Sequence, residues 1–159
     1  MSAVDRLVAG ALGEPGHRLF LLEVEVEGEV VAYALEKLQV AALAEEAQQL
    51  LRDQGLIGRG LSLDPGTVHE ATPVRFRVGG IQLALGDDAA DLAELVLYST
   101  EEDPPVRYEL TVPQLDAFVR VALAVVAAGR PACPRCGLPM DPEGHNCPRN
   151  NGDLRGHRP

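Results

Sequence analysis

The chain has 159 residues and a formal net charge of −10, and apolar residues make up 46% of it. A chain of this length can bury a core without disulfides, so one domain with a small appendage is expected. The acidic balance argues against extensive binding of nucleic acid or anionic membranes, because both carry negative charge. We recognise no apolar run of about 18 residues and no signal peptide, which favours a cytoplasmic protein without a membrane partner.

The first half of the chain has the pattern of strands followed by one helix. Apolar and acidic residues alternate near its start, which predicts a half-buried strand with Glu23, Glu25 and Glu27 on a solvated face. Gly28 and Glu29 supply a turn after this strand. The predicted elements of this half are strands over 5–12, 20–27 and 30–35 and a helix over 36–54.

The second half repeats this order, with predicted strands over 74–85, 92–99 and 106–110 and a helix over 111–129. Thr111 and Gln114 have the spacing of a capping box at the start of this helix. The helix is apolar on almost every side, which predicts either a core helix or a homodimer contact through residues 113–128. Its polar residues Asp116 and Arg120 have the spacing of an ion pair.

A shift of 75 residues aligns Leu35 with Leu110, Gln39 with Gln114 and Leu43 with Phe118. We therefore predict an α+β fold, in which duplicated ββ(β)α units form an antiparallel sheet with two helices on one face. The predicted organisation is a domain over 1–130 with repeats at about 5–54 and 74–129, a surface loop over 55–73, a zinc-binding tail over 131–152 and a disordered end over 153–159.

A cysteine and histidine cluster near the C-terminus carries the clearest chemical signal. Two residues separate Cys133 from Cys136, and His145 and Cys147 follow within 11 residues of Cys136. Three thiolates and an imidazole suit tetrahedral zinc. We predict a zinc knuckle with Cys133, Cys136, His145 and Cys147 as ligands, and a structural role because four protein ligands leave no open position.

Three alternatives to this ligand set remain open. His157 could replace His145 as the fourth ligand, and iron could replace zinc, since sulfur-rich sites hold both metals. Cys133 and Cys136 could also form a redox pair. The redox pair is disfavoured, because these cysteines follow a predicted helix and gain nothing from the dipole at a helix start.

The tail from 127 to 152, with the stretches 5–10, 13–16 and 34–43, resembles domain-of-unknown-function family 3090, an uncharacterised actinobacterial family. The likeness spans most of the chain. It implies that the family's Cys, Cys, His and Cys correspond to Cys133, Cys136, His145 and Cys147. It also implies that His145 is preferred to His157, because the family tail ends soon after Asn151-Gly152. The resemblance implies no established activity.

The composition and motifs leave three hypotheses for the function. The favoured one is a non-enzymatic zinc-binding protein that contacts another protein through its tail, with Arg135 and Arg149 as candidate contacts. The second is an enzyme or small-ligand binder with a site between the repeats, for which Lys37 and His69 are candidates. The third, nucleic-acid binding through the tail, is least favoured because residues 128–159 carry only +2, from five arginines and three carboxylates, against −12 elsewhere.

Overall fold

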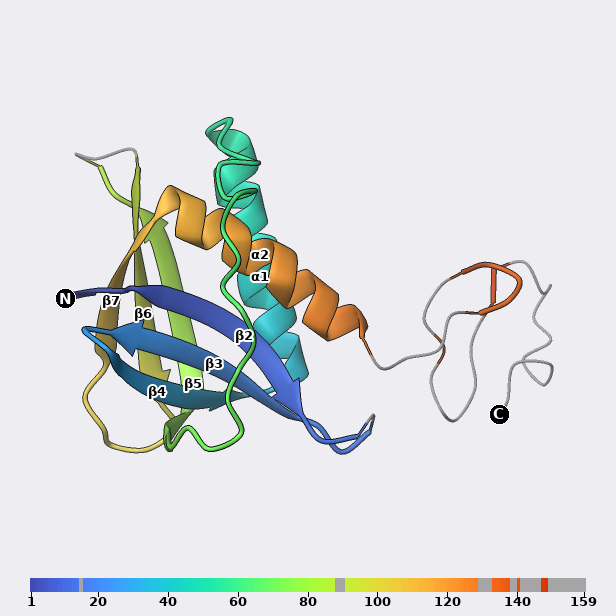
Figure 1. Ribbon diagram of the computed structural model, residues 1–159, viewed down its shortest axis with the longest axis horizontal. Helices are drawn as coiled ribbons and strands as arrows, with labels where there is room; N and C mark the ends of the chain where they lie inside the picture. Colours follow the sequence, from blue (N-terminus) through green and yellow to red (C-terminus); the bar gives the residue numbers. More distant parts are fainter. Residues whose placement is uncertain (15, 88–90, 129–132, 138–139, 141–146, 149–159) are drawn as a thin grey trace. The chain divides into compact units, whose positions relative to one another are not determined.

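The computed structural model describes all of the chain except residues 15, 88–90, 129–132, 138–139, 141–146 and 149–159 (Figure 1). The chain divides into two compact units, residues 1–12 with 19–126, here called the body, and residues 13–18 with 127–159, here called the C-terminal unit. The predicted boundary at residues 130–131 and the predicted disordered end lie outside the described residues.

The body is an α+β unit with one seven-stranded sheet and two helices. Its elements are β1 (Ser2–Ala3), β2 (Arg6–Leu12), β3 (Leu19–Val26), β4 (Glu29–Leu35), α1 (Lys37–Asp53), β5 (Val74–Leu85), β6 (Leu92–Ser99), β7 (Val106–Thr111) and α2 (Val112–Ala127). Every strand and helix predicted from the sequence is present. The predicted end of the second helix, Gly129, lies outside the described residues.

The sheet is mixed, so the prediction of a purely antiparallel sheet is wrong. Its strand order is β1-β7-β6-β5-β4-β3-β2, and the pairs β4·β5 and β1·β7 are parallel. Parallel neighbours need a long crossover connection, which α1 and residues 54–73 supply between β4 and β5. The other four strand pairs are antiparallel, as predicted.

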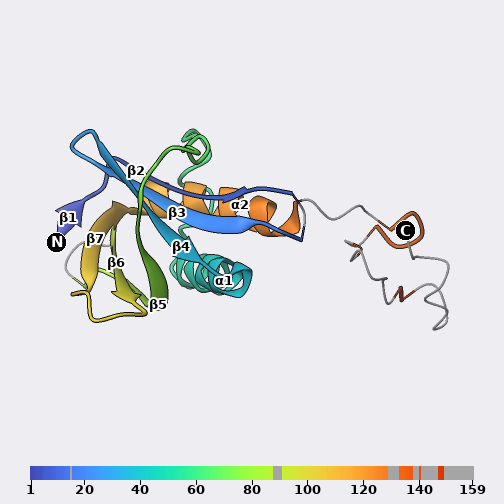
Figure 2. The same cartoon turned by 90° about the horizontal axis from the view of Figure 1, so that it is seen from below.

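The first twelve residues connect the two edges of the sheet (Figure 2). Ser2 pairs with Tyr108 of β7, whereas Arg6 pairs with Glu25 of β3. Between them, the Val4 N–H donates to the Glu109 carbonyl at 3.0 Å, and the Asp5 N–H donates to the Glu25 carbonyl at 2.8 Å. One segment therefore hydrogen-bonds to both ends of the strand order, which leaves little unpaired edge there.

In the first turn of each helix, a glutamine side chain makes two hydrogen bonds. Gln39 Oε1 accepts from the Glu36 N–H at 2.8 Å, and Gln114 Oε1 accepts from the Thr111 N–H at 2.8 Å. The Thr111 hydroxyl in turn accepts from the Gln114 N–H at 3.2 Å, which confirms the predicted capping box. The Gln39 amide also donates to the Val78 carbonyl, and the Gln114 amide to the Val4 carbonyl, both at 2.9 Å.

The main core joins the inward-facing strand residues to both helices in one apolar cluster. Leu115, Phe118 and Ala122 of α2 are fully buried in it, which confirms that this helix is part of the core. Each buried leucine or phenylalanine contributes about 2 kcal/mol to folding. Homodimer formation through this helix stays a prediction. Among the described residues, no helix is long and apolar enough to cross a membrane.

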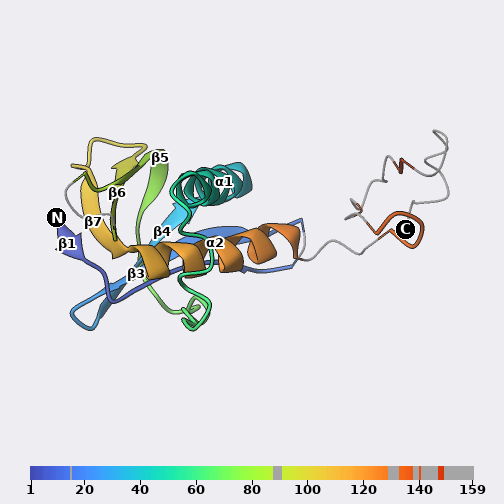
Figure 3. The same ribbon diagram turned by 90° about the horizontal axis from the view of Figure 1, so that it is seen from above.

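The segment over residues 55–73, here called the connecting segment, passes from the end of α1 across α2 (Figure 3). The Asp116 carboxylate accepts from the N–H groups of Gly58 and Gly60 at 3.0 and 2.8 Å. Arg120 donates to the Gly60 carbonyl at 3.3 Å and to the Leu63 carbonyl at 2.7 Å. The predicted ion pair between Asp116 and Arg120 is therefore wrong, because both side chains bind the connecting segment instead.

The rest of the connecting segment covers the outer face of the sheet. Val68 packs against a second apolar cluster of Leu21, Ala32 and Ala34. A Cβ atom added to Gly10 would lie 2.4 Å from Val68 Cγ2, so β2 has no room for a side chain at that point. The segment has no helix or strand and most of its residues are exposed, as expected of a surface connection, but Gly60, Pro65 and Val68 pack against the body.

Candidate metal centre

The C-terminal unit contains a tight turn that places two cysteines side by side. The Gly137 N–H donates to the Cys133 carbonyl at 2.8 Å, and Gly137 has a φ of 75°. An L side chain is strained at such a φ, so glycine suits the residue directly after Cys136. The chain therefore makes a tight turn through the two residues between the cysteines, which brings the Cys136 thiol toward that of Cys133.

The three cysteine sulfurs lie together, all within 4.8 Å of one another. Cys133 Sγ and Cys147 Sγ are 3.8 Å apart, and both residues are buried. Four ligands arranged tetrahedrally at a Zn–S distance of about 2.3 Å would be about 3.8 Å apart. The cluster can therefore hold a metal ion with little rearrangement of these sulfurs.

The environment of Cys133 favours the thiolate that a metal requires. Burial acts to raise the pKa of the Cys133 thiol. Hydrogen bonds to its sulfur, first from the backbone N–H groups of Cys136 and Arg135 and then from the other two thiols, outweigh burial and lower this pKa. Because only the thiolate ligates, a lowered pKa reduces the cost of losing the proton on binding.

The predicted fourth ligand cannot be placed. His145 and the alternative His157 both lie outside the described residues, as does Arg149. Arg135 is described, is exposed, and occupies the turn between the first two cysteines. The structure thus brings together the three predicted thiolates and leaves the predicted nitrogen ligand untested.

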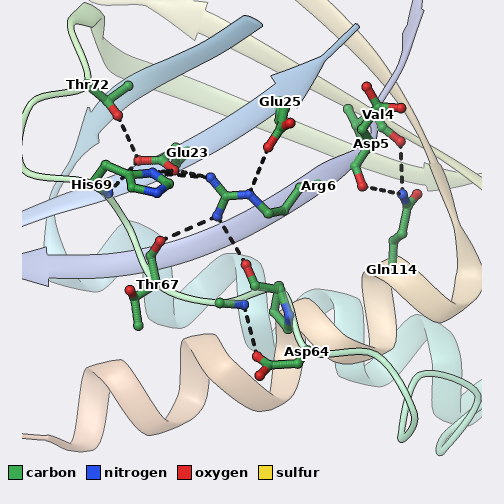
Figure 4. Close-up of polar contacts among 12 residues, drawn as sticks. Val4, Asp5, Arg6, Glu23, Glu25, Asp64, Thr67, His69, Thr72 and Gln114 are labelled. Carbon is green, nitrogen blue, oxygen red and sulfur yellow. Dashed lines mark hydrogen bonds and ion pairs between the residues drawn. The ribbon is translucent and has the colours of Figure 1, made fainter. Parts of the chain in front are cut away.

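A second polar cluster, in the body, was missed by the sequence analysis (Figure 4). Glu23 is fully buried, not solvated, so the prediction of an exposed glutamate row is wrong at this residue. Its Oε1 accepts from Arg6 Nη2 and from His69 Nδ1, the latter at 2.6 Å. Its Oε2 accepts from the His69 N–H at 2.7 Å and from the Thr72 hydroxyl at 3.1 Å.

Arg6 completes this polar cluster from β2. Its Nε donates to Glu25 Oε2 at 3.2 Å, and its Nη1 donates to the carbonyls of Pro65 and Thr67 at 3.0 and 3.4 Å. Burial acts to raise the pKa of Glu23, but the hydrogen bonds from His69, Arg6 and Thr72 outweigh it and lower this pKa. The cluster holds an ionised carboxylate under the connecting segment. An arginine at the start of an otherwise apolar strand was the signal in the sequence.

The remaining candidates from the sequence lie at ordinary surface positions. Lys37 is the first residue of α1, and the neighbouring Glu36 accepts from Arg77 at 3.1 Å. Of the two residues proposed for a ligand site between the repeats, His69 is instead bound to Glu23.

The comparisons with known proteins give a family and nothing more. No curated protein and no solved structure matches the chain. The model of a family described as a protein of unknown function, DUF3090, matches residues 1–147, which include all three cysteines. Since this match covers most of the 159 residues, the chain belongs to the DUF3090 family.

Proposed function

We propose that this protein is a non-enzymatic, zinc-binding protein of the cytoplasm, whose C-terminal unit binds another protein. The observation that carries the proposal is the group of three thiols within 4.8 Å of one another, two of them buried. Zinc fits the tetrahedral S–S spacing, and cysteines in a metal-binding spacing suit a reducing compartment. His145 is proposed as the fourth ligand, in preference to His157.

The proposed zinc site is structural rather than catalytic. With four protein ligands the ion has no open position for a substrate or an activated water. The ion would instead supply the free energy that orders the segment around it, of order 10–16 kcal/mol for structural zinc in small domains. In the body, Glu23 and His69 bind each other and the neighbouring chain, which favours a structural role for this pair.

The proposed partner is a protein that is recognised through the basic C-terminal unit. Residues 128–159 carry +2, whereas the rest of the chain carries −12, so an acidic surface would meet this end of the chain most favourably. Arg135 is exposed in the metal-binding turn, and Arg149 follows Cys147 by two residues. Nucleic acid is the less favoured partner, because the acidic body repels phosphate.

We also infer that the body arose by duplication of one three-stranded unit and its helix. Tyr33 and Tyr108 are 75 residues apart and share a buried hydrogen bond between their hydroxyls. Gln39 and Gln114 are also 75 residues apart, and each lies in the first turn of a helix and donates to a backbone carbonyl of the opposite half. The two parallel strand pairs also link the halves in the same way. β4, the last strand of the first half, pairs with β5, the first strand of the second half, and β7, the last strand of the second half, pairs with β1, the first strand of the chain.

The metal content of the full-length chain tests the zinc site. We expect one zinc per chain by inductively coupled plasma mass spectrometry after purification without added metal. His145→Ala should weaken zinc binding against a competing chelator at least ten-fold, whereas the matched control His157→Ala should not change it. If His157→Ala weakens zinc binding and His145→Ala does not, His157 is the fourth ligand in place of His145. Iron in place of zinc, seen as visible absorption by the purified protein, would refute the choice of metal.

Capture of partners from a native lysate tests the adaptor role. The bait is the intact zinc-loaded protein, and the control bait carries Cys133→Ser and Cys136→Ser. A further bait, Arg135→Ser, keeps the ligands and removes one exposed charge. A protein retained by the intact bait, lost with the cysteine variant and weakened with Arg135→Ser is the expected result. Equal retention by all baits would show that the C-terminal unit does not carry recognition.

A further inference from the structure

The three cysteines of the C-terminal unit differ in how far solvent reaches them. Cys133 and Cys147 are each only 2% exposed, whereas Cys136 is half-buried. Cys136 lies in the tight turn that ends at Gly137, next to the exposed Arg135. A cysteine reacts with a dissolved oxidant only where the oxidant can reach its sulfur. Of the three, Cys136 is therefore the one that a small oxidant meets first.

Cys133 is the sulfur best placed to react with an oxidised Cys136. Its Sγ hydrogen-bonds with the thiols of both Cys136 and Cys147, and all three sulfurs lie within 4.8 Å of one another. A disulfide bond is about 2.0 Å long, so two of these sulfurs must approach each other by about 2–3 Å, which a rotation about the Cα–Cβ bonds can supply. The turn between Cys133 and Cys136 keeps this pair together.

Metal binding keeps these sulfurs reactive. A thiol that coordinates a metal ion is deprotonated, and the thiolate is the nucleophile in reactions with peroxides and disulfides. Cys133 and Cys136 are two of the four proposed zinc ligands. A disulfide between them would leave only His145 and Cys147, whereas a structural zinc site takes four ligands. Oxidation of this pair and retention of the ion therefore exclude each other.

We propose that Cys133 and Cys136 form a reversible disulfide when a hydroperoxide oxidises Cys136, and that this disulfide releases the zinc ion. The inference rests on the proposed zinc site and adds its regulation. It differs from a redox pair in place of the metal, since here the disulfide forms from the metal ligands. Loss of the ion would remove the free energy that orders the segment around it, so a partner bound through this unit would dissociate.

The oxidation takes two steps. The Cys136 thiolate first attacks one peroxide oxygen, the O–O bond breaks and hydroxide leaves, so that the sulfur is oxidised to a sulfenic acid and the peroxide is reduced. The Cys133 thiolate then attacks the Cys136 sulfur, the S–O bond breaks and a second hydroxide leaves as the S–S bond forms. Two thiolates and one hydrogen peroxide give one disulfide and two hydroxide ions, which take protons from the solvent. Two molecules of a cellular thiol return the two electrons and become a disulfide themselves.

Peroxide treatment of the zinc-loaded, full-length protein tests the proposal, with alkylation by iodoacetamide, digestion by trypsin and mass spectrometry as the readout. Trypsin cleaves after Arg135, so Cys133 is separated from Cys136 and Cys147, which share the peptide 136–149. We expect a disulfide between the two peptides, with the alkyl group on Cys147. An alkyl group on Cys136, or a disulfide inside the peptide 136–149, would overturn the assignment. Dimedone, which traps sulfenic acids, should label Cys136 first, and a first label on another cysteine would overturn the order of the steps.

Two matched variants, each of which keeps three of the four proposed ligands, are compared at saturating zinc. Cys136→Ser should slow the loss of thiols in peroxide by about ten-fold or more, whereas Cys147→Ser should change it by less than about two-fold, because the Cys147 sulfur is buried. Equal rates for the two variants would overturn the role of Cys136.

Release of zinc into a chromogenic chelator is followed in the same reaction of the wild-type protein. We expect one zinc ion for each disulfide, and recovery of the bound zinc after dithiothreitol and zinc are added. Zinc-loaded protein that keeps its zinc and its thiols in peroxide would overturn this proposal and leave the proposed function standing. A protein that contains no zinc would refute the proposed function before any peroxide is added.

Discussion

Substitution of Glu23 by glutamine tests whether the connecting segment is held by one buried carboxylate. Four donors reach this side chain, two at each oxygen. Glutamine has nearly the same size, but only one of its terminal atoms accepts hydrogen bonds. Whichever way the amide turns, its NH₂ group faces two donors where the carboxylate had an acceptor.

The geometry sets the size of the effect. The less costly orientation points the NH₂ group toward Thr72, whose hydroxyl can rotate to accept, and leaves the His69 N–H without a partner. An unsatisfied buried donor costs about 1–3 kcal/mol, and loss of the charge opposite Arg6 adds to this. We therefore expect Glu23→Gln to lower the free energy of unfolding by about 3 kcal/mol, which corresponds to about 6–12 °C in Tm.

Urea unfolding followed by circular dichroism measures this difference, with Glu25→Gln as the matched control. Glu25 is on the same strand and binds the same Arg6, but its side chain is 32% exposed. Exposed ion pairs contribute about 1 kcal/mol or less, so the control should be nearly neutral. A cost below about 1 kcal/mol for Glu23→Gln, or a cost equal to that of Glu25→Gln, would refute the anchoring role.

The difference between wild type and Glu23→Gln should also depend on pH. The folded pKa of Glu23 is lowered, so the unfolded chain binds this proton more readily than the folded one. The stabilisation is therefore complete above the unfolded pKa of about 4.3 and disappears as the pH falls through the folded value. The difference in unfolding free energy between the two proteins should therefore narrow as the pH falls below about 4.3, and a difference that stays constant below this pH would contradict the lowered pKa.

Three further predictions concern packing, the buried tyrosines and the metal. Gly60→Ala should cost about 3 kcal/mol in urea unfolding, because its Cβ would lie 2.1 Å from the Pro113 carbonyl oxygen, whereas Gly66→Ala, with φ +74° and open space, should cost about 1 kcal/mol. Tyr33→Phe and Tyr108→Phe should each cost about 1–2 kcal/mol, and the double variant less than their sum, with a coupling of about 1 kcal/mol in a double-mutant cycle. A chelator should make the chain beyond Ala127 sensitive to protease while the body stays resistant, as judged by mass spectrometry of the fragments.

The regular elements were predictable because each has a local signature. The strands over 20–27 and 30–35 and the capping box of Thr111 and Gln114 all depend on a few neighbouring residues, and each is confirmed. The parallel pairs were not predictable in the same way. Which strands lie side by side depends on how α1 and the connecting segment return the chain, and periodicity contains no information on that path.

The candidate metal site was predictable for a related reason. Its three thiols fall within 15 residues, so their meeting requires only a turn and a short loop. The Arg6–Glu23–His69 cluster, in contrast, joins residues 17 to 63 positions apart in the sequence. Alternation correctly indicates that Glu23 and Glu25 share a face of β3. It does not reveal that the connecting segment covers Glu23 and leaves the Glu25 side chain 32% exposed.

Charged residues on otherwise apolar elements would have revealed the packed connecting segment. Arg6 begins an apolar strand, and Asp116 and Arg120 interrupt an apolar helix. A buried charge is costly unless it is paired or hydrogen-bonded, so a charge on such an element implies a polar partner elsewhere in the chain. Here the partners include backbone groups of the connecting segment, which is held to the body by these side chains and by its own His69 and Thr72. Its glycines serve the same arrangement, since Gly60 lies too close to α2 for any side chain.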